Sequence, residues 1–216
     1  MASKEYEALL ALLLEAVEHV QPKQAEAEQG VPVGVSNRHI HLSQKDVDAL
    51  FGTGYQLTPM KDLAQPGQYA CKETVTICGP KGAIEKVRVL GPVRSKTQIE
   101  ILAGDGYKLG VKAPAKLSGD LDDTPGITVV GPKGSIQTLN GLIVAQRHIH
   151  MAPQDALYYG VKDGDIVKIE VCGPRGGIYN NVAIRVTESS ALECHIDTEE
   201  ANAMNVGSAD KVSIIK

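Results

Sequence analysis

The sequence is poor in aromatic residues and has no long stretch of one chemical character. Among 216 residues there is no Trp, one Phe and seven Tyr, and the formal net charge is -4 without a long basic run. This charge pattern gives no electrostatic footprint for nucleic acid. The apolar stretch at residues 8–14 is soon followed by Glu15, so it is too short to span a membrane. We therefore expect neither a nucleic-acid partner nor a membrane partner.

A secretory signal is also missing, because Glu5, Glu7 and Glu15 interrupt the pattern of a basic head and an apolar run. The expected location is the cytoplasm. The four cysteines form no CxxC motif, which argues against a zinc ribbon and against disulfides. We interpret them as small, buried residues: Cys71, Cys78, Cys172 and Cys194.

Glycine and proline are plentiful, with 22 and 11 copies, and they separate short segments rich in Val and Ile. Three of these breaks share a Gly-Pro-basic-Gly pattern, at residues 79–82, 131–134 and 173–176. Apolar strands enter and leave each break, which is typical of β-hairpins. Phosphate-binding loops are the alternative, but the GxxxxGK(S/T) pattern is absent. Many short strands with frequent turns predict a mainly β fold built from small barrels.

Residues 5–20 form the clearest predicted helix, since apolar residues recur at helical spacing and glutamates gather on the opposite side. Pro22 ends this amphipathic helix. The polar residues 23–30 that follow look like a linker.

One tetrapeptide occurs twice: Arg-His-Ile-His at residues 38–41 and again at residues 147–150. On a strand, two histidines separated by one residue point to the same face, so each pair could chelate one metal ion. A lone copy is more often a pair of half-buried strand histidines, but the duplication favours metal binding. A short helix is predicted after each copy, from a capping box at residues 43–46 and from Pro153 at a first helical position.

Catalytic metal sites usually have three protein ligands. Superimposing the Cys-Gly-Pro turns at Cys78 and Cys172 aligns residues 98–101 with residues 193–196 after a one-residue slip, so that Glu100 corresponds to His195. The alternative is that Glu100 is a solvated strand residue and His195 a satisfied polar one. Zn²⁺ suits such ligands best, with Co²⁺, Mn²⁺ or Fe²⁺ as alternatives. The two predicted sites are His39, His41 and Glu100, and His148, His150 and His195.

A dimetal site alone would suggest hydrolysis by metal-bound water. Common His-x-His hydrolases fit poorly, because no Asp-His follows either pair and the chain is short for a (β/α)₈ barrel. Cupins fit poorly as well. A basic set that could lie near the first pair points to phosphate or another oxyanion, although a solvated basic loop would contain the same residues: Arg38, Lys61, Arg88, Arg94 and Lys96.

Four strings in this sequence resemble those of the PduL-like phosphate propanoyltransferases, the phosphotransacylases of bacterial microcompartments. They are Gly-Val-Ser-Asn-Arg-His-Ile-His-Leu-Ser at residues 34–43, Val-Leu-Gly-Pro-Val-Arg-Ser-Lys-Thr-Gln-Ile-Glu at 89–100, Gln-Arg-His-Ile-His-Met at 146–151 and Glu-Cys-His-Ile-Asp at 193–197. The resemblance extends from Val31 to the end of the chain. It implies two small β-barrel domains with short capping helices, after the amphipathic helix and linker at residues 1–27: barrel 1 from residues 28–37 plus 146–216, and barrel 2 from residues 38–145.

The resemblance implies an acyltransferase that exchanges a short acyl group, propanoyl or acetyl, between coenzyme A and phosphate. It implies two Zn²⁺ ions per chain on the same six ligands, and Arg94 as the catalytic residue that positions phosphate. It also implies five substrate-binding positions: Ser36, Lys61, Arg88, Leu90 and Asn202.

The N-terminal helix resembles an encapsulation peptide, which would bind microcompartment shell or lumen proteins through residues 1–20. An ordinary docked helix has the same pattern. A homodimer is the expected assembly.

In the expected mechanism, zinc at the first site stabilises the departing CoA thiolate, while the second zinc and Arg94 hold phosphate for attack on the thioester carbonyl. Cys194 as a nucleophile is the alternative chemistry. Two other functions stay open: a dizinc hydrolase, and a metal-stapled β-barrel module that binds a partner without catalysis.

Overall fold

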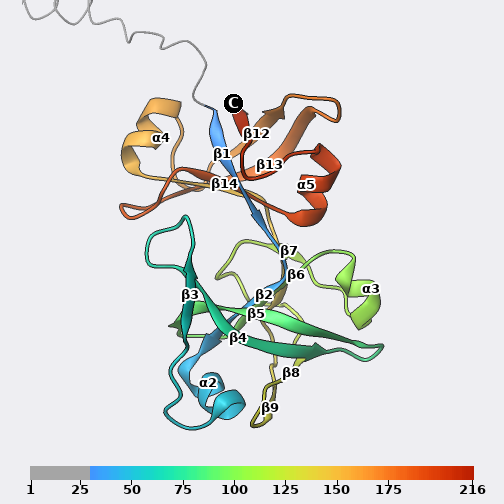
Figure 1. Ribbon diagram of the computed structural model, residues 1–216. Helices are drawn as coiled ribbons and strands as arrows, with labels where there is room; N and C mark the ends of the chain where they lie inside the picture. Colours follow the sequence, from blue (N-terminus) through green and yellow to red (C-terminus); the bar gives the residue numbers. More distant parts are fainter. Residues whose placement is uncertain (1–29) are drawn as a thin grey trace, which may run out of the picture. The chain divides into compact units, whose positions relative to one another are not determined.

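The computed structural model describes residues 30–216 (Figure 1). The helix predicted at residues 5–20 and nearly all of the linker lie outside the described residues. The described strands form two sheets, so the fold is mainly β, as predicted. Within this described part, no helix is both long and apolar enough to cross a membrane.

Six strands close into a barrel in the order β1, β14, β11, β13, β12, β15. Their bounds are β1 (Val31–Ser36), β11 (His148–Met151), β12 (Ile166–Val171), β13 (Gly177–Val186), β14 (Glu193–Asp197) and β15 (Lys211–Ile215). Strand β1 pairs with β14 in parallel and with β15 antiparallel, so it closes a barrel whose other strands come from the C-terminal part of the chain. Helices α4 (Pro153–Tyr159) and α5 (Thr198–Met204) directly follow β11 and β14.

The middle of the chain forms a nine-stranded sheet with the order β7, β10, β6, β2, β5, β4, β8, β9, and with β3 paired to β4. This order does not close, so the second sheet is less complete than the barrel that the sequence predicted. Helices α2 (Gln44–Phe51) and α3 (Asp105–Leu109) follow β2 and β6. The strands are β2 (His39–Ser43), β3 (Pro59–Asp62), β4 (Tyr69–Cys78), β5 (Ala83–Arg94), β6 (Gln98–Ile101), β7 (Ala115–Lys116), β8 (Thr128–Val130), β9 (Ser135–Gln137) and β10 (Leu142–Ala145).

Each sheet packs around its own apolar cluster. Ile40 of β2 lies in one cluster and Ile149 of β11 in the other, and both side chains are fully buried. Burying a side chain of this size contributes about 1.5–3 kcal/mol. Because side chains alternate along a strand, the histidines on either side of each isoleucine point to the opposite face. Residues Val31–Lys216 form one compact unit. The predicted domain boundaries between the two barrels, at residues 37/38 and 145/146, therefore stay a prediction.

The three Gly-Pro-basic-Gly turns are hairpin turns, as predicted: they join β4 to β5, β8 to β9 and β12 to β13. Two of them also pack on helix ends. The backbone N–H of Lys81 donates to the Leu109 carbonyl at 3.1 Å, and that of Lys133 to the Leu50 carbonyl at 3.0 Å. A Cβ at Gly79 would lie 2.2 Å from the Leu109 oxygen, so this turn requires glycine. The turns at residues 79–82 and 131–134 therefore contact the C-terminal ends of helices, which is a structural role.

Both short helices that were predicted after the histidine pairs are present. Ser43 is the N-cap of α2, and its side chain accepts a hydrogen bond from the backbone N–H of Asp46. Pro153 occupies the first position of α4. Each histidine strand is thereby anchored at its C-terminal end.

Candidate active site

The two histidine pairs lie on strands with matching neighbours. Strand β2 lies between β5 and β6, and His39 is directly opposite Glu100 across the antiparallel pair. Strand β11 lies between β13 and β14, and His148 is directly opposite His195. The structure therefore brings together the six predicted ligands as two groups of three.

In the first group, the candidate ligand atoms of His39, His41 and Glu100 lie within 4.8 Å of one another. His39 Nδ1 donates to the backbone oxygen of Asn37 at 2.8 Å, and its Nε2 lies 3.3 Å from Glu100 Oε2. His41 Nδ1 is buried and has no hydrogen-bond partner among residues 30–216. A buried nitrogen of this kind is costly unless it binds something.

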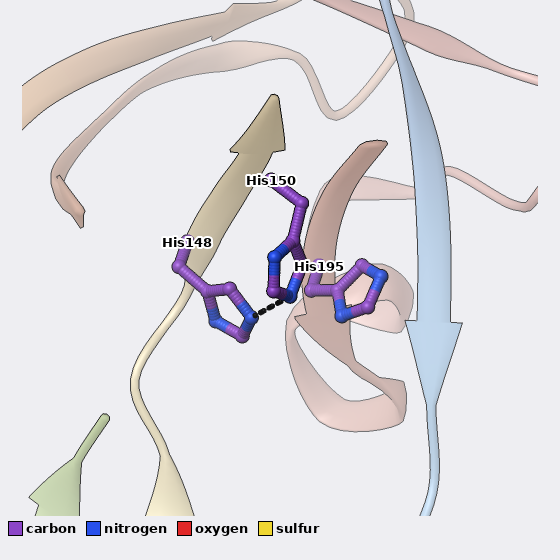
Figure 2. A group of neighbouring side chains, drawn as sticks. All are labelled: His148, His150 and His195. Carbon is purple, nitrogen blue, oxygen red and sulfur yellow. Dashed lines mark hydrogen bonds between the residues drawn. The ribbon is translucent and has the colours of Figure 1, made fainter. Parts of the chain in front are cut away.

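In the second group, three imidazoles converge from β11 and β14 (Figure 2). His148 Nδ1 donates to the backbone oxygen of Gln146 at 2.8 Å, which repeats the contact that His39 makes. His148 Nε2 lies 3.1 Å from His150 Nε2. The ring of His195 lies 5.0 Å and 4.8 Å, between centroids, from the rings of His148 and His150.

Burial keeps three of these imidazoles neutral. It lowers the pKa of His41 to about 2, of His148 to about 4 and of His150 to about 3, and neighbouring imidazoles add to the effect. Burial also lowers the pKa of His39, but the facing carboxylate outweighs it and leaves this pKa raised. Burial raises the pKa of Glu100, yet the attraction of His39 holds it well below its ordinary value. Neutral imidazoles at His41, His148 and His150 and an ionised Glu100 are the protonation states that bind a metal, whereas His39 would give up its proton on binding one.

Both groups fit a divalent metal ion. In a tetrahedral Zn²⁺ site with bonds of about 2.0–2.1 Å, ligand atoms lie roughly 3.3 Å apart. The separations of 3.3 Å from His39 to Glu100 and 3.1 Å from His148 to His150 agree with this geometry. Hydrogen bonds from Nδ1 of His39 and His148 leave Nε2 of each ring for a metal.

The arginines that begin the two motifs have a structural role. Arg38 forms a two-point ion pair with Asp105, with Nε to Oδ2 at 2.7 Å and Nη2 to Oδ1 at 2.9 Å. Arg147 Nε donates to Glu200 Oε1 at 2.6 Å and its Nη1 to the Asn180 carbonyl at 3.0 Å. Arg38 therefore leaves the set of candidate oxyanion-binding residues.

Arg94 lies at the end of β5 rather than in a loop, and its Nη1 donates to Ser118 Oγ at 3.0 Å. Burial and the nearby positive charge of Arg185 lower the pKa of Arg94, whereas the negative charge of Glu100 raises it.

Arg185 stands opposite His150 in the parallel pair of β11 and β13, and no ion pair of its guanidinium is found among residues 30–216. Two guanidinium groups and two ligand groups thus share one region, a combination that attracts an anion.

Comparison with known proteins identifies the family. A family model described as Phosphate propanoyltransferase matches residues 32–207. The chain belongs to this family of acyltransferases. The phosphate propanoyltransferase of Thermotoga maritima is 60 % identical over 190 residues, covering 88 % of this chain and 90 % of the relative. That of Rhodobacter capsulatus is 61 % identical over 176 residues, covering 82 % of this chain and 82 % of the relative. That of Clostridioides difficile is 50 % identical over 205 residues, covering 95 % of this chain and 98 % of the relative.

The five positions expected to bind substrate in this phosphate propanoyltransferase family lie in different surroundings. Leu90 of β5 is opposite His41, and Arg88 is opposite His39, with its Nη1 donating to the carbonyls of Cys71 and Lys72 at 3.0 and 2.8 Å. The hydroxyl of Ser36 lies 3.4 Å from the Ile196 carbonyl. Lys61 in β3 and Asn202 in α5 are exposed. Leu90 and Arg88 are thus the two that strand pairing places beside the first ligand group.

The sequence left Cys194 open as a nucleophile, and the structure argues against it. Cys194 is fully buried in the apolar cluster of the barrel. Burial raises the pKa of its thiol to about 12, so the thiolate is scarce at neutral pH. It also points to the face of β14 opposite that of His195.

Arg185 was not among the site residues that the sequence predicted. It lies 35 residues from His150 along the chain (185 minus 150), and only the pairing of β11 with β13 brings the two together. In the two halves of the fold, the residue opposite His41 is Leu90 and the residue opposite His150 is Arg185, so the guanidinium has no counterpart in the first half.

Proposed function

We propose that this chain exchanges a short acyl group, propanoyl or acetyl, between coenzyme A and phosphate. The observation that carries the proposal is the pair of three-ligand groups with Arg94 and Arg185 beside them. Membership of the phosphate propanoyltransferase family supports it. In the reaction, an oxygen of phosphate forms a bond to the thioester carbon, the carbon–sulfur bond breaks, and the sulfur leaves as CoA thiolate.

Six residues would hold two Zn²⁺ ions in this proposal: His39, His41, Glu100, His148, His150 and His195. A bound Zn²⁺ ion supplies Lewis-acid stabilisation of a thiolate or an oxyanion. The two groups differ in their ligands, because the first contains the carboxylate of Glu100 and the second contains three imidazoles. This difference supports a different role for each metal ion in the reaction. We assign the first group to the CoA sulfur and the second to phosphate.

Arg94 is the catalytic residue in this assignment. Its hydrogen bond to Ser118 fixes one edge of the guanidinium, which leaves its other N–H groups for a phosphate oxygen. Arg185 is the second cation for the same anion, because it flanks His150 and lies near Arg94. Two cations held near each other without a paired carboxylate on Arg185 gain free energy when a phosphate binds between them.

The substrate-binding positions carried over from the resemblance remain part of the proposal: Ser36, Lys61, Arg88, Leu90 and Asn202. The location of Leu90 and Arg88 beside the first ligand group supports a role near the thioester end of CoA. The exposed amine of Lys61 suits a phosphate group of CoA.

The partners and the location are also proposals. We propose a homodimer in the cytoplasm, and a microcompartment address in residues 1–20. Deleting residues 1–25 is expected to keep activity and to lose recruitment into the microcompartment lumen. Loss of activity in that variant would instead assign the segment to the enzyme itself.

The test of function is CoA release from propanoyl-CoA and acetyl-CoA by the purified full-length chain, with and without phosphate. The proposal predicts release that requires phosphate and forms one acyl phosphate per CoA. Release without phosphate would identify a dizinc hydrolase. No release, with zinc bound, would identify a binding module.

A further inference from the structure

In both ligand groups, the third ligand is held by the side chain two residues before it on the same strand. Gln98 Nε2 donates to Glu100 Oε1 at 2.6 Å in β6. His195 Nε2 donates to Glu193 Oε2 at 2.5 Å in β14. Alternation along a strand puts each of these pairs on one face, with the residue between them in the core.

The two supporting residues occupy the same place in the two halves of the chain. Gln98 is directly opposite His41 across the β2–β6 pair, and Glu193 is directly opposite His150 across the β11–β14 pair. Each ligand group is therefore a four-residue rectangle on two antiparallel strands. Three corners carry candidate ligands and the fourth carries the support.

The chemistry of each support matches the ligand that it holds. Glu100 is a carboxylate that accepts hydrogen bonds, and Gln98 offers it an amide donor. His195 has a ring N–H to donate, and Glu193 offers it a carboxylate acceptor. A carboxylate at position 98 would instead repel Glu100.

Each support is also fixed by contacts of its own. Gln98 is 2 % exposed; its Oε1 accepts from the Gly119 N–H at 2.8 Å and its Nε2 donates to Ser118 Oγ at 2.8 Å. Glu193 Oε2 lies 3.4 Å from Gln65 Nε2. A Cβ at Gly34, which pairs with His195 on the other side of β14, would lie 2.6 Å from Glu193 Cδ. A glycine at position 34 thus leaves the room that the carboxylate occupies.

We propose that Gln98 and Glu193 are matched positioning residues for the two metal sites, an inference that rests on the metal sites of the proposed function. Gln98 engages Oε1 of Glu100 and leaves Oε2, the oxygen facing His39, for the metal. Glu193 holds the proton of His195 on Nε2, so that Nδ1 is the nitrogen with a free lone pair. Glu193 belongs to neither group of converging ligand atoms, and the amide of Gln98 is not among the side chains that ordinarily bind Zn²⁺.

The first test is a titration of the metal-free full-length chain with Zn²⁺ alone, in competition with a chromophoric chelator. Loss of such a support typically lowers metal affinity by about 10–100-fold. Glu193→Leu should weaken one site by that factor and leave the other unchanged, and Gln98→Leu should do the reverse. Gly34→Ala should weaken the same site as Glu193→Leu, because its methyl group displaces the carboxylate. Glu170→Leu, at an exposed position of β12, is the matched control and should bind like the unmodified chain.

A second test exchanges the supports, and it answers the objection that a variant is merely unstable. Glu100→His alone would place an imidazole beside an amide; Glu100→His with Gln98→Glu would rebuild the arrangement of the second site. We expect the double variant to bind Zn²⁺ at least tenfold more tightly at the first site than the single variant. Co²⁺ in the rebuilt site should give the absorption spectrum of the three-histidine site.

Equal affinity of the single and double variants, or unchanged affinity in Glu193→Leu, would overturn the inference. Failure of the unmodified chain to bind Zn²⁺ would overturn it as well. Because the readout is metal affinity, it does not depend on the acyl transfer reaction. A chain that binds two Zn²⁺ ions with these dependences but transfers no acyl group would refute the proposed function alone.

Discussion

The hydroxyl of Ser118 lies 3.0 Å from Nη1 of Arg94 and 2.8 Å from Nε2 of Gln98, so one side chain connects the proposed catalytic arginine to the support of Glu100. A hydrogen bond of this kind contributes about 1 kcal/mol, which corresponds to roughly a fivefold change in rate. Ser118→Ala is therefore expected to lower kcat/KM for phosphate about fivefold. Steady-state kinetics check this, with Ser135→Ala at an exposed position of β9 as the control. Identical kinetics in Ser118→Ala would contradict the proposed link.

Arg94→Ala tests the catalytic assignment more severely. The variant is expected to lose turnover while its zinc content stays near two ions per chain, because Arg94 binds no metal in this account. Metal analysis and CoA release on one preparation measure both quantities. If zinc is lost together with activity, Arg94 is a structural residue.

Arg185→Gln separates the second cation from the first. Removing a charge-assisted hydrogen bond to phosphate costs about 1.5–3 kcal/mol, so KM for phosphate should rise about tenfold or more. The KM for propanoyl-CoA should change little. Lys168→Gln removes an equal charge from an exposed position of β12 and serves as the control. An equal rise of both KM values, or no rise, would remove Arg185 from the phosphate site.

The ion pair of Arg147 and Glu200 predicts a pH-dependent stability. Burial raises the pKa of Glu200 above its ordinary value, although Arg147 opposes the shift. Arg147→Met leaves the partly buried Glu200 carboxylate without its ion-pair partner, which costs about 1–3 kcal/mol when the carboxylate is ionised. Because the pKa of Glu200 is raised in the folded state, the stability that this group contributes is present at low pH and is lost as pH rises through its folded-state pKa.

The deficit in the free energy of unfolding of Arg147→Met should therefore be large at pH 7 and shrink as pH falls through the raised pKa of Glu200, which lies above its ordinary value of 4.5. Urea unfolding of both chains at several pH values measures this difference. A deficit that stays constant from pH 4 to pH 7 would show that lost packing, not charge, destabilises the variant.

The cysteines predict a pattern of alkylation. Burial raises the pKa of Cys71 to about 11 and of Cys194 to about 12, and both side chains are fully buried. Cys78 is partly exposed and Cys172 is exposed, so the expectation that all four cysteines are buried is wrong for these two. Iodoacetamide at pH 8 should modify Cys172 and Cys78 in the folded chain and all four cysteines in denaturant, as read by mass spectrometry. Rapid modification of Cys194 in the folded chain would reopen the acyl-cysteine route.

Much of the candidate site could be predicted because its signals are local. The alternation of His39, Ile40 and His41 determines the shared face of the histidines, and the turn at Gly79 specifies its hairpin. The internal repeat then supplied the partners Glu100 and His195. These inferences needed no knowledge of how distant strands pair.

Features that depend on long-range strand pairing could not be predicted. Arg185 reaches His150 through the register of β11 and β13, and no local pattern encodes a register between parallel strands. The nine-stranded sheet was expected to close, yet closure depends on the pairing of its edge strands β7 and β9. The ion pair of Arg38 with Asp105 likewise joins residues far apart in the chain, so Arg38 was assigned to the wrong group.

The most direct test of direct transfer from CoA to phosphate is isotope exchange between labelled phosphate and propanoyl phosphate. If phosphate attacks the thioester without an acyl-enzyme, label enters propanoyl phosphate only when CoA is present, because the acyl group must first return to CoA. The account predicts exchange with CoA and none without it. Exchange in the absence of CoA would reveal an acyl-enzyme and contradict the account, and no exchange even with CoA would contradict the proposed reaction itself.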